Sequence, residues 1–380
     1  MVFLQRLSLR NFRNFEEEVV EFPQAGAALI GDNGQGKTNL LEAVYYLEIF
    51  RSFRGARDEQ LVSLGRQYFR VEGSLVDAEG DGRTEVSAAY SRDGRRKKVS
   101  IAGREAVRLG DAIGRVGAII FTASDVDIVV GGPSIRRRYL DIVLSLAEPS
   151  YLAALQRYRQ VLSQRNGLLR DGAGPVELAA WNSGLVENGI RIFRARAAWV
   201  ASVRKSFARY YGAISGGQEV DLEYRPVVKL GDLGAPSEAE ESWRSAFLAE
   251  LERQSERERR RGLSLVGPHR DDLGFRVADG ESNRLALRNY GSAGQQRTAA
   301  VALRMVEAET LRRSGGRRPI VMLDDVFAEL DPSRAERVVG LLTAEEWGQI
   351  IVTSPKPDEF AIMGASLPEY RIRNGRVRRS

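Results

Sequence analysis

The chain of 380 residues contains no cysteine and a single histidine, His269. Without cysteine it has neither disulfides nor a cysteine-ligated zinc site, so we expect a reducing compartment. No apolar run approaches the roughly 18 residues that a membrane-spanning helix needs. Met1 is followed at once by Val2-Phe3-Leu4, without the basic start or cleavage-like site of a secretory signal. The sequence therefore predicts a cytoplasmic protein with no membrane partner.

Residues 31–38 read Gly-Asp-Asn-Gly-Gln-Gly-Lys-Thr, a complete phosphate-binding loop. The glycines let backbone N–H groups converge on one anion, Lys37 reaches the terminal phosphates and the Thr38 hydroxyl can ligate Mg²⁺. Apolar residues at 27–30 predict a strand before the loop, and those at 38–49 predict a helix that begins at the phosphates. This agreement favours a site for ATP and Mg²⁺ over a chance glycine-rich turn. We assign to the nucleotide Gly31, Asp32, Asn33, Gly34, Gln35, Gly36, Lys37, Thr38 and Asn39.

Two acids, Asp324 and Asp325, follow a continuous apolar run at 319–323. The run predicts a buried strand, and ligands of α/β proteins bind at the carboxyl ends of such strands. By position Asp324 is the expected Mg²⁺ ligand beside Thr38. Asp325 is the expected general base, and Lys37 joins it as a catalytic residue, because phosphoryl transfer depends on positioning and charge neutralisation. A pair of helix-capping acids is the alternative interpretation.

Other segments support a nucleotide site and resemble a known family. Ser292-Ala293-Gly294-Gln295-Gln296 resembles the signature motif of ATP-binding-cassette ATPases, and residues 329–331 resemble the loop after their Walker B strand. Together with residues 9–15, 132–141 and 267–272, they resemble the SMC-like branch of these ATPases and, within it, the RecF family of bacterial recombinational repair proteins. These segments cover nearly the whole chain.

The resemblance implies a homodimer joined by ATP. In this class the signature segment of one subunit caps the triphosphate held by another, and the chain has one phosphate loop and one signature segment. Two composite sites therefore need two chains, and slow hydrolysis would release them. A plain helix N-cap is the alternative role for Ser292, compatible with the first. The further nucleotide-binding residues so implied are Arg13, Ser292, Gly294, Gln295 and Asp331.

The resemblance also implies a role in DNA repair, replication-fork maintenance and the SOS response. It implies binding to duplex DNA, gapped DNA or single-strand/duplex junctions, cooperation with RecO and RecR, and help in loading RecA. The alternatives are a nucleotide-switched interaction scaffold and an ATPase acting on a non-DNA partner, such as a transporter cassette or a small-molecule kinase. Transporter cassettes usually carry a histidine after Walker B, where this chain has Ile350 to Ser354. No glutamine occurs at 120–126, where cassette ATPases often place one.

Positive charge points weakly to a polyanion. Lys and Arg number 57 against 51 Asp and Glu, for a net charge of +6 and a pI ≈ 9.6. Any one basic cluster is more often a solvated face, and further clusters include 136–138, 259–261 and 376–379. The turn signal Asp93-Gly94 predicts a hairpin whose tip can reach phosphates. The DNA-binding candidates are Arg95, Arg96, Lys97 and Lys98 at this tip, then Arg51 and Arg54.

The pattern of the whole chain predicts an α/β fold: an ABC-type P-loop ATPase head with a second, largely helical lobe. We expect an ATPase lobe at 1–121 plus 318–380 and a second lobe at 122–317, which ends in the signature motif and its helix. Long helices are expected at 134–171 and 176–211. Leu178, Leu185, Ile192 and Trp199 recur every seven residues, but the break at 172–175 and a strand at 219–224 indicate helices that fold back, with no long coiled coil. Two roles are equally open for His269: a structural residue in a turn, and a member of an interlobe polar network. Strands are expected at 2–10, 17–22, 67–76, 84–91, 97–101, 349–353 and 369–373.

Overall fold

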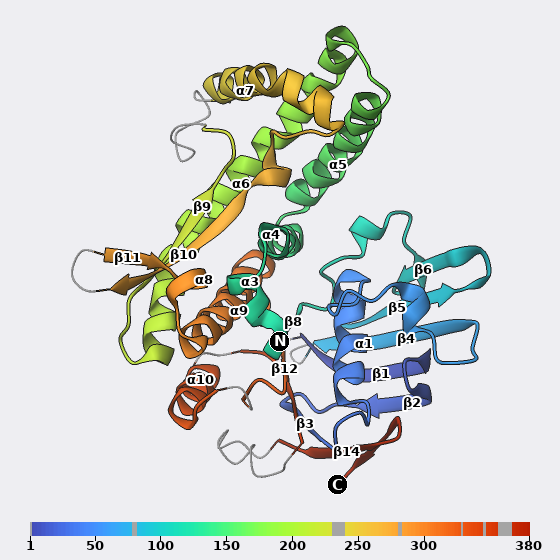
Figure 1. Cartoon of the computed structure of the whole chain (residues 1–380). Helices are drawn as coiled ribbons and strands as arrows, with labels where there is room; N and C mark the ends of the chain where they lie inside the picture. Colours follow the sequence, from blue (N-terminus) through green and yellow to red (C-terminus); the bar gives the residue numbers. More distant parts are fainter. Residues whose placement is uncertain are drawn as a thin grey trace. The chain divides into compact units, whose positions relative to one another are not determined.

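The computed structural model describes residues 2–77, 82–229, 240–279, 283–327, 330–344, 347–355 and 367–380. Its elements are labelled in Figure 1. The chain divides into two compact units, Met1–Asp125 with Leu303–Ser380 and Val126–Ala302. The first unit contains both the phosphate loop and the acid pair, and the second contains most of the long helices. The predicted α/β class with a mainly helical second part is confirmed.

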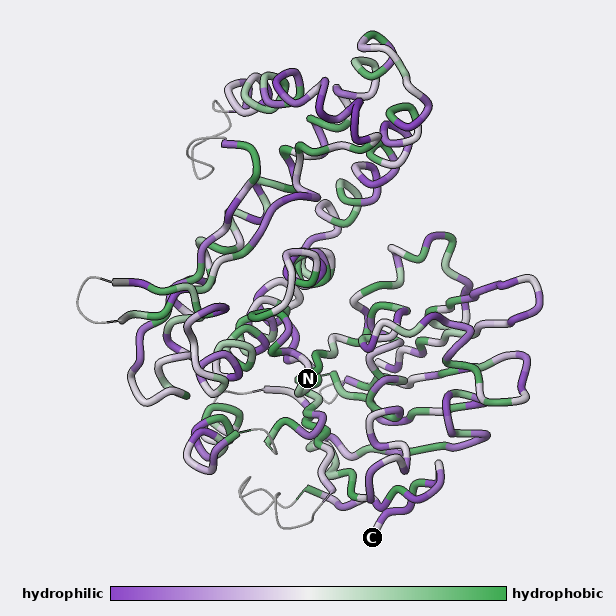
Figure 2. Tube along the Cα trace, in the orientation of Figure 1, coloured by the Kyte–Doolittle hydropathy of each residue, from purple (hydrophilic) through white to green (hydrophobic). Residues whose placement is uncertain are grey.

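The first unit holds a sheet in the order β15-β14-β3-β13-β12-β8. All pairs are parallel except β14 with the edge strand β15. All five residues of β3 are buried, as are four of five in β12 and β8. Strands covered on both faces need continuous apolar runs, and these central strands appear as green stretches in Figure 2. The strands are β3 (Gly26–Ile30), β8 (Ala118–Thr122), β12 (Ile320–Asp324), β13 (Ile350–Ser354), β14 (Glu369–Arg373) and β15 (Arg376–Arg379).

A second, antiparallel sheet of this unit has the order β2-β1-β4-β5-β6-β7. Helix α1 (Lys37–Ile49) contacts strands of both sheets. Eleven of its residues are buried, which explains why it lacks a polar face. The strands are β1 (Val2–Phe12), β2 (Phe15–Glu21), β4 (Tyr68–Asp77), β5 (Arg83–Ser91), β6 (Arg96–Ile101) and β7 (Arg104–Glu105). The unit also contains helices α2 (Asp58–Leu61) and α10 (Pro332–Ala344).

The second unit combines long helices with a three-stranded sheet, β11-β10-β9. The expected helix at 134–171 is two helices, because Glu148 is extended (φ −137°, ψ 105°) and Pro149 starts a new helix. A residue before proline disfavours the helical region. The strands are β9 (Val220–Arg225), β10 (Asp272–Asp279) and β11 (Asn283–Ala286). The helices are α3 (Val126–Val130), α4 (Pro133–Ala147), α5 (Pro149–Arg170), α6 (Pro175–Ser215), α7 (Glu240–Arg261), α8 (Leu287–Tyr290) and the start of α9 (Ala293–Gly315).

Helix α6 is the long element of this unit, with 41 residues. Its seven-residue stripe is buried, from Leu178 at 4% exposure to Trp199 at 6%. The stripe packs within the unit, where α6 contacts α5 and β9, and α5 and α6 lie side by side in Figure 1. Helices that fold back on each other in this way confirm the expected absence of a long coiled coil among the described residues.

The boundary between the units falls within α9, after Ala302, and not at 317 as expected. The reason is the packing of the later turns of α9 in the first unit. Arg304 forms two hydrogen bonds with Asp125, at 2.6 and 3.0 Å, and one with Glu307 at 2.6 Å. Asp125 also accepts the backbone N–H of Thr122 at 2.8 Å. The segment after β8 is thus tied to the later turns of α9 by a buried ion pair.

Candidate nucleotide site

The phosphate loop turns tightly between β3 and α1, and its glycines are required by geometry. Gly34 and Gly36 have φ of +80° and +120°, a region that favours glycine. A Cβ on Gly36 would lie 2.7 Å from Asn14 Nδ2, and one on Gly31 would lie 2.4 Å from the carbonyl oxygen of Ile372. The loop therefore has the conformation that its sequence predicts.

Lys37 begins α1 and folds its side chain over the loop. Its Nζ donates to the carbonyl oxygen of Gly31 at 2.6 Å and to that of Asp32 at 3.2 Å. Lys37 is only 4% exposed. The positive charge thus lies beside the N-terminus of a helix, where the backbone N–H groups and the helix dipole also favour an anion.

The acid pair at the end of β12 meets the phosphate loop. Thr38 Oγ1 donates to Asp324 Oδ1 at 2.9 Å. Burial raises the pKa of Asp324, while hydrogen bonds from Thr38 and Thr353 lower it. A hydroxyl and a carboxylate suit Mg²⁺, which usually takes one or two protein oxygens and completes its shell with phosphates and water. The described residues contain no cluster of three or more His, Cys, Asp or Glu, so a metal held by protein groups alone is not supported there.

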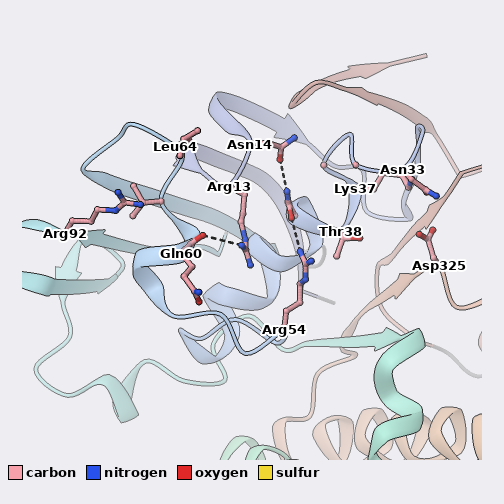
Figure 3. Close-up of a pocket in the computed structure, with 14 residues that line it drawn as sticks. Arg13, Asn14, Asn33, Lys37, Thr38, Arg54, Gln60, Leu64, Arg92 and Asp325 are labelled. Carbon is pink, nitrogen blue, oxygen red and sulfur yellow. Dashed lines mark hydrogen bonds between the residues drawn. The ribbon is translucent and has the colours of Figure 1, made fainter.

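Asp325 differs from Asp324 in the direction of its side chain and in its backbone conformation. It lines a pocket of ≈ 660 Å³ that also contains Lys37 and Thr38 (Figure 3). Its φ of 50° is uncommon for a residue with a side chain. Thr353 from β13 stabilises it, because the Thr353 hydroxyl accepts the Asp325 N–H at 3.0 Å and lies 3.2 Å from Asp325 Oδ1. Thr353 was not predicted as a site residue, although its place at the end of the neighbouring strand is a usable signal.

The wall of this pocket is a polar network anchored on a buried glutamate. Arg13 binds both carboxylate oxygens of Glu42, at 2.8 and 2.9 Å, and Glu42 is wholly buried. Arg54 donates to Asn39 Oδ1 at 3.2 Å, and Asn39 in turn donates to Asn14 at 2.8 Å. Arg54 was predicted to bind DNA, but the structure places it in the nucleotide pocket, because its guanidinium is fixed by Asn39 and lies near Glu42.

The far end of the pocket is less polar. Leu64 is fully exposed there, and Val62 and Arg92 line the same end of the pocket. An apolar surface next to a planar cation can receive a flat heteroaromatic base. Asn14, Glu42 and these three residues were not predicted as site residues. Glu42 lies within α1, and the others lie in turns or loops between elements of the first unit.

The signature segment forms the start of α9 in the second unit. The Ser292 N–H donates to Gln295 Oε1 at 2.8 Å, and the Gln295 N–H donates to Ser292 Oγ at 3.2 Å. This reciprocal pair is a capping box. Ser292 is exposed, and its hydroxyl proton is not used by the cap. The N-cap role is therefore observed, and the side chain keeps a donor for a second partner.

Asp331 caps α10 in the first unit. Its Oδ1 accepts the Arg334 N–H at 3.1 Å and the Ser333 hydroxyl at 2.9 Å. The backbone N–H of Arg334, and then the Ser333 hydroxyl, hold the pKa of Asp331 below its usual value. Ala328 and Glu329 of the same expected loop lie outside the described residues.

The hairpin of β5 and β6 forms as predicted, with Ser91 paired to Arg96. Arg95 and Arg96 are exposed at its tip, and Arg51 is exposed after α1. Lys97, also predicted to bind DNA, has partners within the fold: its Nζ lies 2.7 Å from Asp58 Oδ2 and 2.7 Å from the carbonyl oxygen of Phe50. These contacts favour a structural role for it. Lys98 is exposed and lies 3.6 Å from Glu105.

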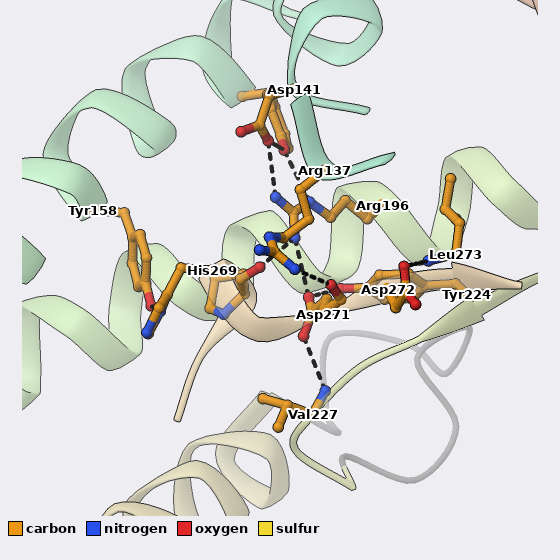
Figure 4. Close-up of polar contacts among 12 residues, drawn as sticks. Arg137, Asp141, Tyr158, Arg196, Tyr224, Val227, His269, Asp271, Asp272 and Leu273 are labelled. Atoms are coloured by element: carbon orange, nitrogen blue, oxygen red, sulfur yellow. Dashed lines mark hydrogen bonds and ion pairs between the residues drawn. The ribbon is translucent and has the colours of Figure 1, made fainter. Parts of the chain in front are cut away.

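His269 belongs to a buried polar network in the second unit (Figure 4). Its Nε2 lies 3.0 Å from the carbonyl oxygen of Ser264, which only accepts, so Nε2 carries the proton. Nδ1 then accepts the Tyr158 hydroxyl at 2.6 Å. Burial lowers the pKa of His269 to about 4. The partners all belong to residues 126–302, which supports the structural role over an interlobe one.

A second buried cluster of polar side chains in this unit is centred on Arg196, which is 2% exposed. It binds Asp141 at 2.8 Å and Asp271 at 3.1 Å, and it donates to the carbonyl oxygen of Pro268 at 2.7 Å. Tyr224 donates to Asp271 as well. Burial raises the pKa of Asp271, and Arg196 opposes this shift. These buried charges are paired and hydrogen-bonded, which fixes the packing of α4, α6 and β10.

Comparison with known proteins agrees with this site. The RecF/RecN/SMC N terminal domain family matches residues 3–376. A relative named "DNA replication and repair protein RecF" from Synechococcus sp. (strain JA-3-3Ab) is 38% identical over 365 residues, which cover 94% of this chain and 93% of the relative.

Solved structures give the same result. A RecF-ATPrS structure described as a recombination mediator in the RecFOR pathway has a TM-score of 0.88 at 29% identity, covering 100% of this chain and 98% of that one. A Smc head domain from Pyrococcus furiosus, at 16% identity and a TM-score of 0.57, covers 100% of this chain and 96% of that one and shares the fold alone. Within the described residues, no helix is long and apolar enough to cross a membrane.

Proposed function

Because the chain belongs to the RecF/RecN/SMC N terminal domain family, and within it to the RecF proteins, we propose that it is an ATPase that binds DNA in recombinational repair. The observation that carries this proposal is the hydrogen bond between Thr38 and Asp324, which joins the phosphate loop to the acid pair. The RecF-ATPrS and RecF-ATP structures of similar fold support ATP as the nucleotide.

Each residue of the site has a distinct role in hydrolysis. Thr38 and Asp324 would hold Mg²⁺, which neutralises charge on the phosphates. Lys37 places a further positive charge at the loop. Asp325 orients the attacking water and accepts its proton, because its carboxylate faces the pocket while that of Asp324 is bound to Thr38. We expect slow turnover, suited to a nucleotide that controls assembly.

ATP joins two copies of the chain into a homodimer with two composite sites. The exposed N-terminus of α9, where Ser292 keeps a hydroxyl proton, is suited to bind a phosphate held by the other copy. ATP binds the closed dimer more tightly than it binds the monomers, and this difference in binding free energy is what stabilises the dimer. Hydrolysis removes that difference and releases the dimer.

DNA is the partner that the dimer binds. Arg95, Arg96, Lys98 and Arg51 are exposed cations of the first unit, and phosphate contacts by such residues are independent of base sequence. We propose duplex, gapped or junction DNA as substrate, with RecO and RecR as partners and RecA loading as the outcome. The RecFOR pathway named for the similar structure supports these partners.

Sedimentation velocity ultracentrifugation tests this function. The chain should be monomeric alone, dimeric with ATP and Mg²⁺, and dimeric on DNA when a gapped duplex is added. A chain that stays monomeric while saturated with ATP would refute the composite site. ATP-dependent dimers that release no phosphate would support the alternative of a nucleotide-switched scaffold.

A further inference from the structure

The C-terminal hairpin carries an array of arginines that the nucleotide site does not use. β14 and β15 pair antiparallel, with Arg371 opposite Arg378 and Arg373 opposite Arg376. Opposite residues and residues two apart on one strand share a face of a sheet. All four guanidinium groups therefore belong to one face, which we call the arginine array. The alternate β14 residues are buried on the other face.

The turn of this hairpin is fixed to the phosphate loop. Asn374 and Gly375 have φ of 49° and 68°, as in the two-residue turns that join antiparallel strands. Their N–H groups donate to the side chain and the backbone oxygen of Gln35, at 2.7 and 3.2 Å. A Cβ on Gly375 would lie 2.2 Å from the Asn14 carbonyl oxygen. The array is thus held on a rigid element that contacts the loop.

Most of the charge of the array is not neutralised. Arg376 lies 3.5 Å from Glu18 and donates to the carbonyl oxygen of Glu17 at 2.9 Å. Among the described residues, no acidic side chain lies within ion-pair distance of Arg371, Arg373 or Arg378, and all three are exposed.

This arrangement is unfavourable for the chain alone. Like charges directly opposite each other destabilise an antiparallel pair, and the array contains two such pairs. An anion with several charges would relieve the repulsion. The arginines of the hairpin also line a hollow of ≈ 620 Å³.

We propose that the arginine array binds the phosphate backbone of DNA. The proposal rests on the proposed DNA-binding function and places part of that site at the C-terminal hairpin. Side chains about 7 Å apart along a strand and about 5 Å apart across it can contact several phosphates at once, and each guanidinium can bind a phosphate with two hydrogen bonds. Contacts to phosphates carry no sequence information, so we expect binding through the array to be independent of base sequence.

The test replaces one opposed pair in the full chain, Arg371→Ala with Arg378→Ala. Its matched control is Arg257→Ala with Arg261→Ala, two exposed arginines of α7, which removes the same charge. Affinity for a fluorescent duplex with a single-stranded tail is measured with ATP over a range of KCl concentrations. The slope of log affinity against log salt should fall by about 2, because each phosphate contact contributes about 0.9. At 0.1 M KCl the affinity should fall at least ~10-fold.

The control should bind DNA as the unmodified chain does. Both variants should bind ATP and have a melting temperature no lower than that of the unmodified chain. An unchanged slope in the hairpin variant would overturn the proposal, as would an equal loss in the control. Binding of polyglutamate, an anionic peptide, is measured as well. If the hairpin variant lost this binding but kept its binding to DNA, the array would be a protein-binding surface, and this result would also overturn the proposal. Absence of DNA binding by the unmodified chain would instead refute the proposed function itself.

Discussion

Thr38, in the first turn of α1, donates a hydrogen bond to Asp324 at the end of β12, although 286 positions separate them in the chain. The contact forms because β3 and β12 are parallel strands of one sheet with β13 between them. Loops at the carboxyl ends of parallel strands meet at one edge, where ligands bind. The contact separates the roles of the two acids, since it leaves Asp325 directed into the pocket.

Replacement of the two acids should have different effects. Asp324→Asn should weaken ATP binding that depends on Mg²⁺, because the metal loses its charged ligand. Asp325→Asn should keep that binding, lower turnover by about 10²- to 10⁴-fold and prolong the dimer. Mg²⁺ titrations of nucleotide affinity and assays of phosphate release measure both. Normal hydrolysis by Asp325→Asn, with unaltered Mg²⁺ dependence in Asp324→Asn, would contradict the assignment.

Lys37→Met should abolish tight ATP binding and the ATP-dependent dimer. The side chain is buried, yet among the described residues its Nζ donates to backbone oxygens of the loop alone. Methionine fills similar space, so the cost in stability should be about 1–2 kcal/mol. Calorimetric ATP titration and sedimentation measure the loss, and thermal denaturation is the control for folding. A variant that dimerises normally with ATP would rule out this role.

Ser292→Arg should bind ATP as a monomer but fail to dimerise, because Ser292 acts on the nucleotide of the other copy. Ser292→Ala is the matched control for the capping box, whose loss costs about 1 kcal/mol. The alanine variant should therefore dimerise more than the arginine variant does. Fluorescent nucleotide binding and sedimentation separate the two effects. Loss of ATP binding by the Ser292→Arg monomer would show that Ser292 acts within its own chain.

Local patterns in the sequence were sufficient for much of the fold. Continuous apolar runs identified the central strands, and alternation identified most of the antiparallel sheet. Helix α7 was missed because its buried residues Trp243, Phe247 and Leu251 form a narrow stripe in a highly charged segment. The edge strands β7, β11 and β15 are too short for a clear pattern.

The site shows where such reasoning stops. The phosphate loop and the acid pair carry motifs, but Glu42 and Thr353 owe their roles to tertiary contacts. Lys97 was assigned to DNA from its charge and its place near a predicted hairpin tip, and Arg54 from its charge in a basic cluster. Their side chains bind Asp58 and Asn39 respectively, and a sequence pattern does not specify which partner a long cation will find.

The burial of His269 predicts a dependence of stability on pH. Its pKa is about 4 in the folded chain and about 6.5 when unfolded. Between these values the unfolded chain binds more protons, so the free energy of unfolding rises with pH and falls on acidification. From pH 7.5 to pH 5 the loss attributable to His269 should be about 2 kcal/mol. His269→Gln keeps an N–H donor and should lose less stability over this range.

Glu48 makes an opposite contribution to the pH dependence of stability, and the two contributions must be separated. Burial raises its pKa to about 7 from 4.5, so it contributes stability below pH 4.5 that is lost as pH rises through 7. Both the unmodified chain and His269→Gln contain Glu48, so its effect cancels when their free energies of unfolding are subtracted at each pH. NMR titration of the single imidazole gives an independent measurement. A midpoint near 6.5 in the folded chain would contradict the prediction.

The hairpin of β5 and β6 should separate stability from DNA binding. Lys97 contacts Asp58 and lies 5.2 Å from the ring centroid of Tyr46. Lys97→Ala should therefore lower the free energy of unfolding by about 1 kcal/mol and leave the salt dependence of DNA binding unchanged. Arg95→Ala with Arg96→Ala should leave unfolding unchanged and lower the salt slope by about 2. Urea denaturation and DNA titrations in KCl test both variants. If the arginine pair changes neither affinity nor slope, the hairpin tip is a solvated face, and the remaining phosphate contacts belong to Arg51 and the C-terminal array.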